Sequence, residues 1–441
     1  MKRLFAIGLA LLLPAAALLA GNTTEFYVDG LKVIHRQSPK DVISVRLFVQ
    51  GGSANYSKAK EGVEALAFQV AMQGGTKSMD KVAFQTAAEK IGTSFGSNTT
   101  YDYGDLSMTC IKAFWDESWK LFSDAVLNPA FASSEFETMR AQAIATAKGN
   151  ESDPDAHLRN LAMVHSFGAD NDYGKIPSGS VKSLEGLSLG DLSSHYASVV
   201  GKKNVFLVVV GNIDAKDLKA KIEATLGNLP DGNSPKVIKR TLITEDGHYI
   251  EERDIATNYI RGLMTAPRMN TPDGVPMLVA MNILGDRYFE ELRTKRSLSY
   301  APSAFYARSV VNNPYNVIYI STQDPKQSMQ VMVEEINKIK KDGFEASELT
   351  NTKQSFLTYY YMELETSASQ TNSIGMAELN GGWEMGEDFT DKVNAITLND
   401  LNRVFDTYTK AIKWTYLGKK ADVDVADFPK PIDIPAKNKP Y

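Results

Sequence analysis

The sequence predicts an α+β protein built from two homologous α/β sandwich domains, each an antiparallel-rich sheet covered by helices. The first reason is the length of 441 residues, which suits two domains. The second is that segments in which apolar residues recur every second residue alternate along the chain with segments in which they recur every 3.6 residues. The third is a helix-start pattern that recurs in the second half, which indicates an internal duplication.

Composition narrows the class of protein. The chain has 48 Lys+Arg, 53 Asp+Glu and a formal net charge of −5, with 43% hydrophobic residues. This balance predicts a folded protein without a nucleic-acid-binding surface. Cys110 has no second cysteine to pair with, so a disulfide framework is excluded.

The N-terminus has the features of a secretory signal peptide. Lys2 and Arg3 precede an uncharged, Leu- and Ala-rich run that ends in small residues. We expect cleavage after Ala17 or Ala20 and a periplasmic protein, because a lone thiol suits that compartment. The alternative is an uncleaved segment that anchors the chain to the inner membrane. No later segment is expected to span a membrane.

The elements of the first half follow from local patterns. Asp29 and Gly30 form a tight turn between two strands within 26–35, and 43–49 alternates as a strand with one buried face. From Gly62 to Gly75 apolar residues follow helical spacing. Further helices are predicted at 79–91, 115–127, 134–149, 154–167, 188–199 and 215–226, with two strands within 93–113 and a buried strand at 205–210.

The turn-rich segment 229–235 divides the chain. We predict a signal peptide over 1–21, an N-terminal domain over 22–228 and a linker over 229–245. A C-terminal domain over 246–430 and a tail over 431–441 follow.

The duplication is visible in two pairs of motifs. Ser188-Leu-Gly-Asp-Leu begins a helix that leads into a strand, and Thr397-Leu-Asn-Asp-Leu does the same 209 residues later. Both fit the Ser/Thr-x-x-acid start pattern. Phe131-Ala-Ser-Ser-Glu and Phe344-Glu-Ala-Ser-Glu form the second pair, offset by 213. Coincidence among common caps is the alternative.

The chain resembles the pitrilysin/insulinase zinc metallopeptidases in their short, two-domain, processing-peptidase-like bacterial form. The resemblance covers nearly the whole chain after 21. It rests on the order and spacing of the segments at 43–49, 62–76, 172–174 with Gly179, 204–211, 283–285 and 292–300.

Peptidases of that family carry an inverted zinc motif, H-x-x-E-H, whose two histidines bind zinc and whose Glu activates water. With Gly62 aligned, the resemblance puts Ala65 and Gln69 at the ligand positions and Phe68 at the base position. With Arg140 as the anchor, the third ligand falls on Thr146, or on the neighbouring Ala147. The chain is therefore a degenerate member, with no metal site expected in it.

Other candidate residues have simpler interpretations. His157 and His165 lie too far apart on one predicted helix to share an ion. His35, His195 and His248 are isolated and expected at strand ends and on a helix surface. Glu61 and Glu64, near the motif, are expected to be solvated charges on a helix. Cys110 is expected to be a buried structural thiol.

One part of the family machinery is present. The resemblance matches Arg293 and Tyr300, in Leu-Arg-x-x-x-x-Leu-x-Tyr, to a pair that contacts substrate and stabilises the tetrahedral intermediate. The alternative is that both residues serve packing.

These observations predict the zinc-less, non-catalytic subunit of a periplasmic heterodimeric metalloendopeptidase. The partner would be a homologous subunit with an intact H-x-x-E-H and its zinc, and the ligands would be peptides. The alternative is a structural or peptide-holding subunit without a part in catalysis.

Overall fold

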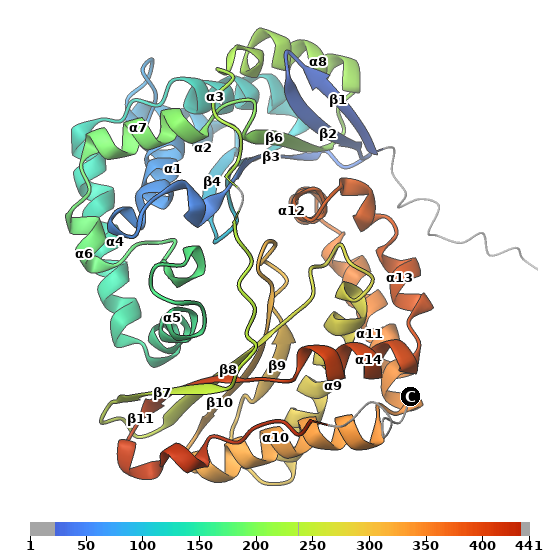
Figure 1. Cartoon of the computed structure of the whole chain (residues 1–441). Coiled ribbons are helices and arrows are strands. Elements are labelled where there is room, and N and C mark those ends of the chain that lie inside the picture. The colour runs from blue at the N-terminus through green and yellow to red at the C-terminus, as the bar shows by residue number, and fades with distance from the viewer. Residues whose placement is uncertain (1–22, 237, 434–441) are drawn as a thin grey trace, which may run out of the picture.

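The computed structural model describes residues 23–236 and 238–433, so the predicted signal peptide over 1–21 lies outside it. Figure 1 shows two halves, one above the other, each with a sheet and a set of helices. Within the described part of the chain, no helix combines the length and the apolar character needed to cross a bilayer.

The N-terminal sheet has the order β1-β2-β6-β3-β5-β4. Only β2 and β6 run parallel among its pairs in the described residues. The predicted turn is present, with Asp29 and Gly30 both at positive φ. The strands are β1 (Thr23–Val28), β2 (Leu31–Gln37), β3 (Val42–Gln50), β4 (Ser94–Thr99), β5 (Tyr103–Ile111) and β6 (Val205–Gly211).

The helices of this half agree with the predicted ones to within a few residues, and a short helix at 181–185 adds to them. They are α1 (Val63–Gln73), α2 (Lys81–Lys90), α3 (Trp115–Leu127), α4 (Ser133–Ser152), α5 (Pro154–Phe167), α6 (Val181–Glu185), α7 (Leu189–Val199) and α8 (Ala215–Ala224).

The C-terminal sheet has the order β7-β11-β8-β10-β9. Its strands are β7 (Gly247–Glu252), β8 (Asn258–Thr265), β9 (Ser303–Tyr306), β10 (Tyr315–Thr322) and β11 (Lys413–Gly418). Its helices are α9 (Gly274–Tyr288), α10 (Pro325–Asp342), α11 (Ala346–Glu363), α12 (Ser367–Leu379), α13 (Phe389–Ala395) and α14 (Leu398–Tyr408), and a π-helical segment, Phe289–Thr294, continues α9.

The two halves have the same topology. The order β2-β6-β3-β5-β4 matches β7-β11-β8-β10-β9, and in both the first pair is parallel and the others are antiparallel. The repeated helix starts are real capping boxes, Ser188 with Asp191 at α7 and Thr397 with Asp400 at α14. The predicted duplication is therefore confirmed.

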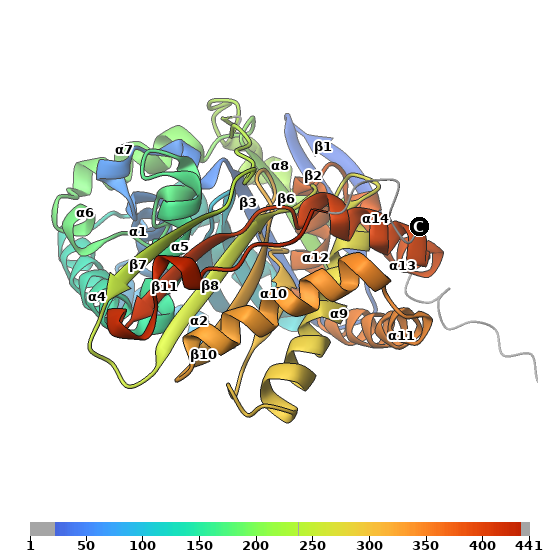
Figure 2. The ribbon, with the colours of Figure 1, turned by 60° about the horizontal axis from the view of Figure 1, so that its bottom comes forward.

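Each half lends one helix to the sheet of the other half. Helix α5 packs on β8 and β11, and α12 packs on β3 and β6 (Figures 1 and 2). The Oγ atoms of Ser44 and Thr371 lie 3.1 Å apart across this contact. Gly375 lies against Phe48 so closely that a Cβ there would come within 2.0 Å of the ring.

This exchange corrects one expectation. Strand β3 was predicted to bury one face, but both of its faces are largely buried. The second face carries Ser44, Arg46 and Phe48, whose polar members suggest solvent. It is covered because α12 arrives from the other half of the chain.

Candidate functional site

Helix α1, which carries the degenerate zinc motif, begins at a tight backbone contact. Gly62 precedes it with φ 83°, in the left-handed region that favours glycine. A Cβ on Gly62 would lie 2.8 Å from the Cα of Gly179. These two family landmarks therefore meet in space, and the backbone contact requires both to be glycine.

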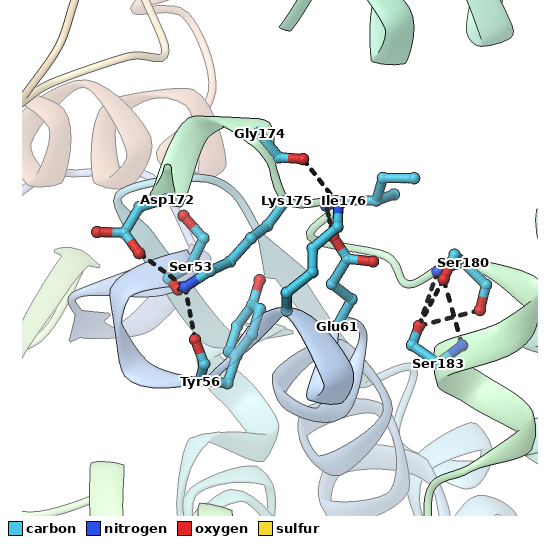
Figure 3. Close-up of polar contacts among 10 residues, drawn as sticks. Ser53, Tyr56, Glu61, Asp172, Gly174, Lys175, Ile176, Ser180 and Ser183 are labelled. Carbon is cyan, nitrogen blue, oxygen red and sulfur yellow. Dashed lines mark hydrogen bonds and ion pairs between the residues drawn. The ribbon is translucent and has the colours of Figure 1, made fainter. Parts of the chain in front are cut away.

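The loop before α1 is held by buried charges (Figure 3). Lys175 is buried and its Nζ donates to the carbonyl oxygens of Ser53 and Tyr56 and to Asp172, at 2.6–2.8 Å. Glu61 accepts from the backbone N–H of Ile176 at 2.8 Å. The landmark at 172–174 thus lies in a loop that helps to hold the start of α1 in place through these hydrogen bonds.

Two predictions about acids near the motif are wrong. Glu61 is 2% exposed and Glu64 is fully buried, so neither is a solvated helix charge. The reason is tertiary: Glu61 faces the 172–176 loop, and Glu64 accepts from Asn55 at 2.9 Å and lies 3.0 Å from the Nε2 of His195. His195 is buried in α7 and does not lie on a helix surface.

The face of α1 that would carry the two ligands is open. Ala65 and Gln69 are partly exposed, and Gln73 continues the same stripe. The other residues of α1 are buried. Of the two predicted ligand positions, Ala65 has no ligating atom and Gln69 offers an amide oxygen, and Gln is not a usual zinc ligand.

The base position is filled by an aromatic ring. Phe68 is fully buried and meets Tyr196 edge-on, with ring centroids 6.1 Å apart. Its ring lies so close to Gly104 of β5 that a Cβ there would come within 2.5 Å. The space next to the ligand stripe is therefore packed hydrocarbon, which can neither activate water nor solvate a charge.

The third-ligand position lies on α4. Thr146 is exposed and its hydroxyl donates to the carbonyl of Gln142 in its own helix, at 3.0 Å. Its neighbour Ala147 is the buried residue of the two and joins the core that α1 shares. Within residues 23–236 and 238–433 no three His, Cys, Asp or Glu side chains gather as a metal site requires. The residues present thus do not fit zinc.

The remaining histidines and the cysteine have structural surroundings. His157 and His165 lie on α5 and reach β7, where His157 pairs with Glu251 at 2.7 Å and His165 stacks on Tyr249. His35 is buried in β2, and His248 stacks on Phe428. Cys110 is buried in β5, and burial raises the pKa of its thiol to about 11, which disfavours a nucleophile.

Arg293 and Tyr300 lie in the other half, in and after the π-helical segment. The Arg293 guanidinium lies 4.2 Å from the Tyr300 ring centroid and 4.7 Å from that of Phe289. Tyr300 is 80% exposed. The main neighbours of this segment are α9 and α10, whereas α1 packs on α7, β4 and α4. The chain does not bring the Arg–Tyr pair to its own α1.

Comparison with known families gives two matches in chain order. A model described as Insulinase (Peptidase family M16) matches residues 32–172, and one described as Peptidase M16 inactive domain matches 186–356. This chain belongs to peptidase family M16. The first match holds the degenerate zinc helix, and the second holds Arg293 and Tyr300.

Several M16 relatives are similar over most of their length. A protein of Helicobacter pylori named as a non-peptidase homologue is 20% identical over 84% of this chain and 87% of its own. A crystal structure of a peptidase M16 inactive domain from Pseudomonas fluorescens has a TM-score of 0.82 at 19% identity, covering 90% of this chain and 98% of that one.

Two further M16 proteins have informative names. The mitochondrial-processing peptidase subunit beta of Blastocladiella emersonii is 22% identical over 58% of this chain and 55% of its own. The periplasmic protease PqqL of Escherichia coli has a TM-score of 0.75 at 13% identity, with 95% of this chain covering 49% of that one.

Proposed function

We propose that this chain is the zinc-less subunit of a paired, exported M16 metalloendopeptidase and does not hydrolyse peptides alone. Ala65, Phe68 and Gln69 in place of the ligands and base support the absence of independent activity. The H. pylori relative named as a non-peptidase homologue agrees with it.

The observation that carries the pairing is the position of Arg293 and Tyr300. Neither side chain has a hydrogen bond or ion pair to another residue of the described chain. The exposed rings of Phe289 and Tyr300 hold the guanidinium between them. A pair of hydrogen-bond donors without acceptors in the described chain is available to a second molecule. The relative named as a processing peptidase subunit also belongs to a protein with more than one chain.

The share of this chain in the chemistry would be electrostatic. Zinc and the general base belong to the partner, which carries the intact H-x-x-E-H. The Arg293 guanidinium and the Tyr300 phenol would donate hydrogen bonds to the substrate oxygen as it gains negative charge. Peptides would bind by adding a strand to a sheet edge, for which β4 and β9 are the candidates in this chain.

Export is the second part of the proposal. It rests on the charged, apolar and small-residue order of 1–21. The similar fold of a protein named as a periplasmic protease agrees with it.

The deciding experiment uses the processed chain together with a homologous subunit that carries H-x-x-E-H, sought first in the neighbouring gene. The pair should hydrolyse unstructured peptides that neither chain cleaves alone. Arg293→Ala or Tyr300→Phe should reduce turnover by roughly 10²–10³-fold, the effect of removing one transition-state donor.

The control is Arg296→Ala, in the same exposed segment, where Arg296 bonds Glu291 of its own chain. Dimer concentration must be matched, because a weaker interface would also slow the reaction. If the doubly substituted pair turns over as fast as the unmodified pair, the chain is a scaffold subunit instead.

A further inference from the structure

A large hollow lies beside β9, the edge strand of the C-terminal sheet. Its volume is about 950 Å³, within the range of ligand sites. We name it the β9 hollow; its walls include Arg159, Arg261, Asp286, Phe305, Tyr315 and Tyr359. Arg293 and Tyr300 are not among the residues that line it.

Arg261 is a partly buried cation that has an aromatic neighbour but no internal anion: its guanidinium carbon lies 5.8 Å from the centroid of the Phe305 ring. Its side chain lies on the face of β8 that looks toward α5, and its Nε is buried with no hydrogen bond in the described residues. Arg159 of α5 lies close by and adds a second positive charge. Burial lowers the pKa of Arg261, and the charge of Arg159 contributes to this. Neither guanidinium forms an ion pair within 23–236 and 238–433.

A second unsatisfied group lies beside Arg261. Thr415 is the residue opposite it in the register of β8 and β11, and its buried hydroxyl also lacks a partner in the described chain. By contrast, Arg308 in the same wall has Glu363 at 3.9 Å. Arg159 is exposed, whereas Arg261 is withdrawn from water at its Nε and has no compensating anion, which is costly. The two arginines at one cavity wall therefore indicate an anion supplied from outside.

The shape of the space favours an extended ligand. A neighbouring cavity of about 630 Å³ shares Arg308, Tyr360 and Glu363 with the β9 hollow, so the two cavities adjoin at these residues. Phe305, which is 38% exposed, adds an aromatic surface from the edge strand itself. A small inorganic anion would leave most of this volume unused.

We propose that the β9 hollow binds a peptide through one of its carboxylates, held by Arg261 and Arg159, with its apolar side chains on the aromatic wall. The carboxylate is either the C-terminus or an acidic side chain. This binding needs no partner subunit, so it can hold or fail independently of the pairing proposed above.

The test is fluorescence anisotropy of the processed chain with three labelled peptides of one sequence. The first has a free C-terminus and no acidic residue, the second has a C-terminal amide and one internal Glu, and the third has the amide and Gln in its place. We expect the first or the second to bind about ten- to hundredfold more tightly than the third, as charge-assisted hydrogen bonds imply. The tighter peptide identifies the source of the carboxylate.

Arg261→Met and Arg159→Gln should each abolish this preference, and Arg403→Gln, at an ion pair with Asp273 outside the β9 hollow, should keep it. Arg261→Met should also keep or raise the melting temperature, since it removes a partly buried charge that has no internal anion. Equal binding of all three peptides overturns the proposal. So does an Arg261→Met variant that melts lower and keeps the preference, because Arg261 would then serve the fold alone.

Discussion

At the residue scale, the segment that aligns with the zinc motif packs into the core of the N-terminal half. Phe68 is a core residue wedged between Tyr196 and Gly104, and Glu64 contacts His195 and Asn55 through one carboxylate oxygen. A carboxylate at position 68 would enter hydrocarbon without a partner. The ring of Phe68 thus contributes to the packing that stabilises the N-terminal half.

This packing makes a stability prediction. Phe68→Ala should lower the free energy of unfolding by about 3–5 kcal/mol, since it removes a buried ring from a site that the sheet prevents from closing. Urea denaturation followed by circular dichroism measures it. Val82→Ala, at a residue 73% exposed on α2, should leave the midpoint nearly unchanged. A loss below about 1 kcal/mol for Phe68→Ala would mean that the ring is not packed as described.

At the element scale, α5 joins the two halves and carries a histidine, His165, that should make the stability of this contact depend on pH. It packs on β8 and β11, and His165 stacks on Tyr249 of β7 with ring centroids 3.4 Å apart. Burial lowers the pKa of His165, and the nearby Glu251 opposes this. His165 therefore binds a proton less readily in the folded chain than in the unfolded chain.

The stability of the folded chain should decrease as the solution is acidified. The contribution of His165 to stability is complete above its unfolded pKa of about 6.5 and decreases as the pH falls through that value toward the lower folded pKa. His165→Phe keeps a stacking ring and should make the unfolding midpoint less dependent on pH between about 7 and 5. Asn160→Ala on the same helix should leave that dependence intact. An unchanged slope in His165→Phe would contradict the prediction.

At the scale of the whole molecule, the reciprocal docking of α5 and α12 makes the two halves one body. The connection between them carries no helix or strand among the described residues of 229–246. The N–H groups of Lys202 and Lys203 donate to the carbonyls of Pro230 and Asp231, each at 2.9 Å. The linker predicted over 229–245 begins at this attachment, and exposed residues of the linker follow it.

Limited proteolysis should therefore cut the connection first and leave the molecule assembled. Trypsin should cleave after the exposed Lys236, and the two fragments should elute together until denaturant is added, because the exchanged helices hold them. Size-exclusion chromatography after cleavage checks this. First cuts within α1 or within 293–300 would show that the domain division is wrong, and fragments that separate in buffer would contradict the exchange.

The local elements and the duplication could be predicted from the sequence, as could the placing of Ala65, Phe68 and Gln69, which lack zinc-ligand and base chemistry, on one helix. These follow from neighbours along the chain: apolar periods, capping boxes and the spacing of a family motif. The surroundings of the polar residues, by contrast, depend on the tertiary structure. Glu61, Glu64 and His195 have ordinary helical surroundings in sequence, and they are buried because segments more than 100 residues away supply their partners. The second face of β3 and the unpaired Arg261 depend in the same way on helices that cross between the halves, contacts that no local pattern encodes.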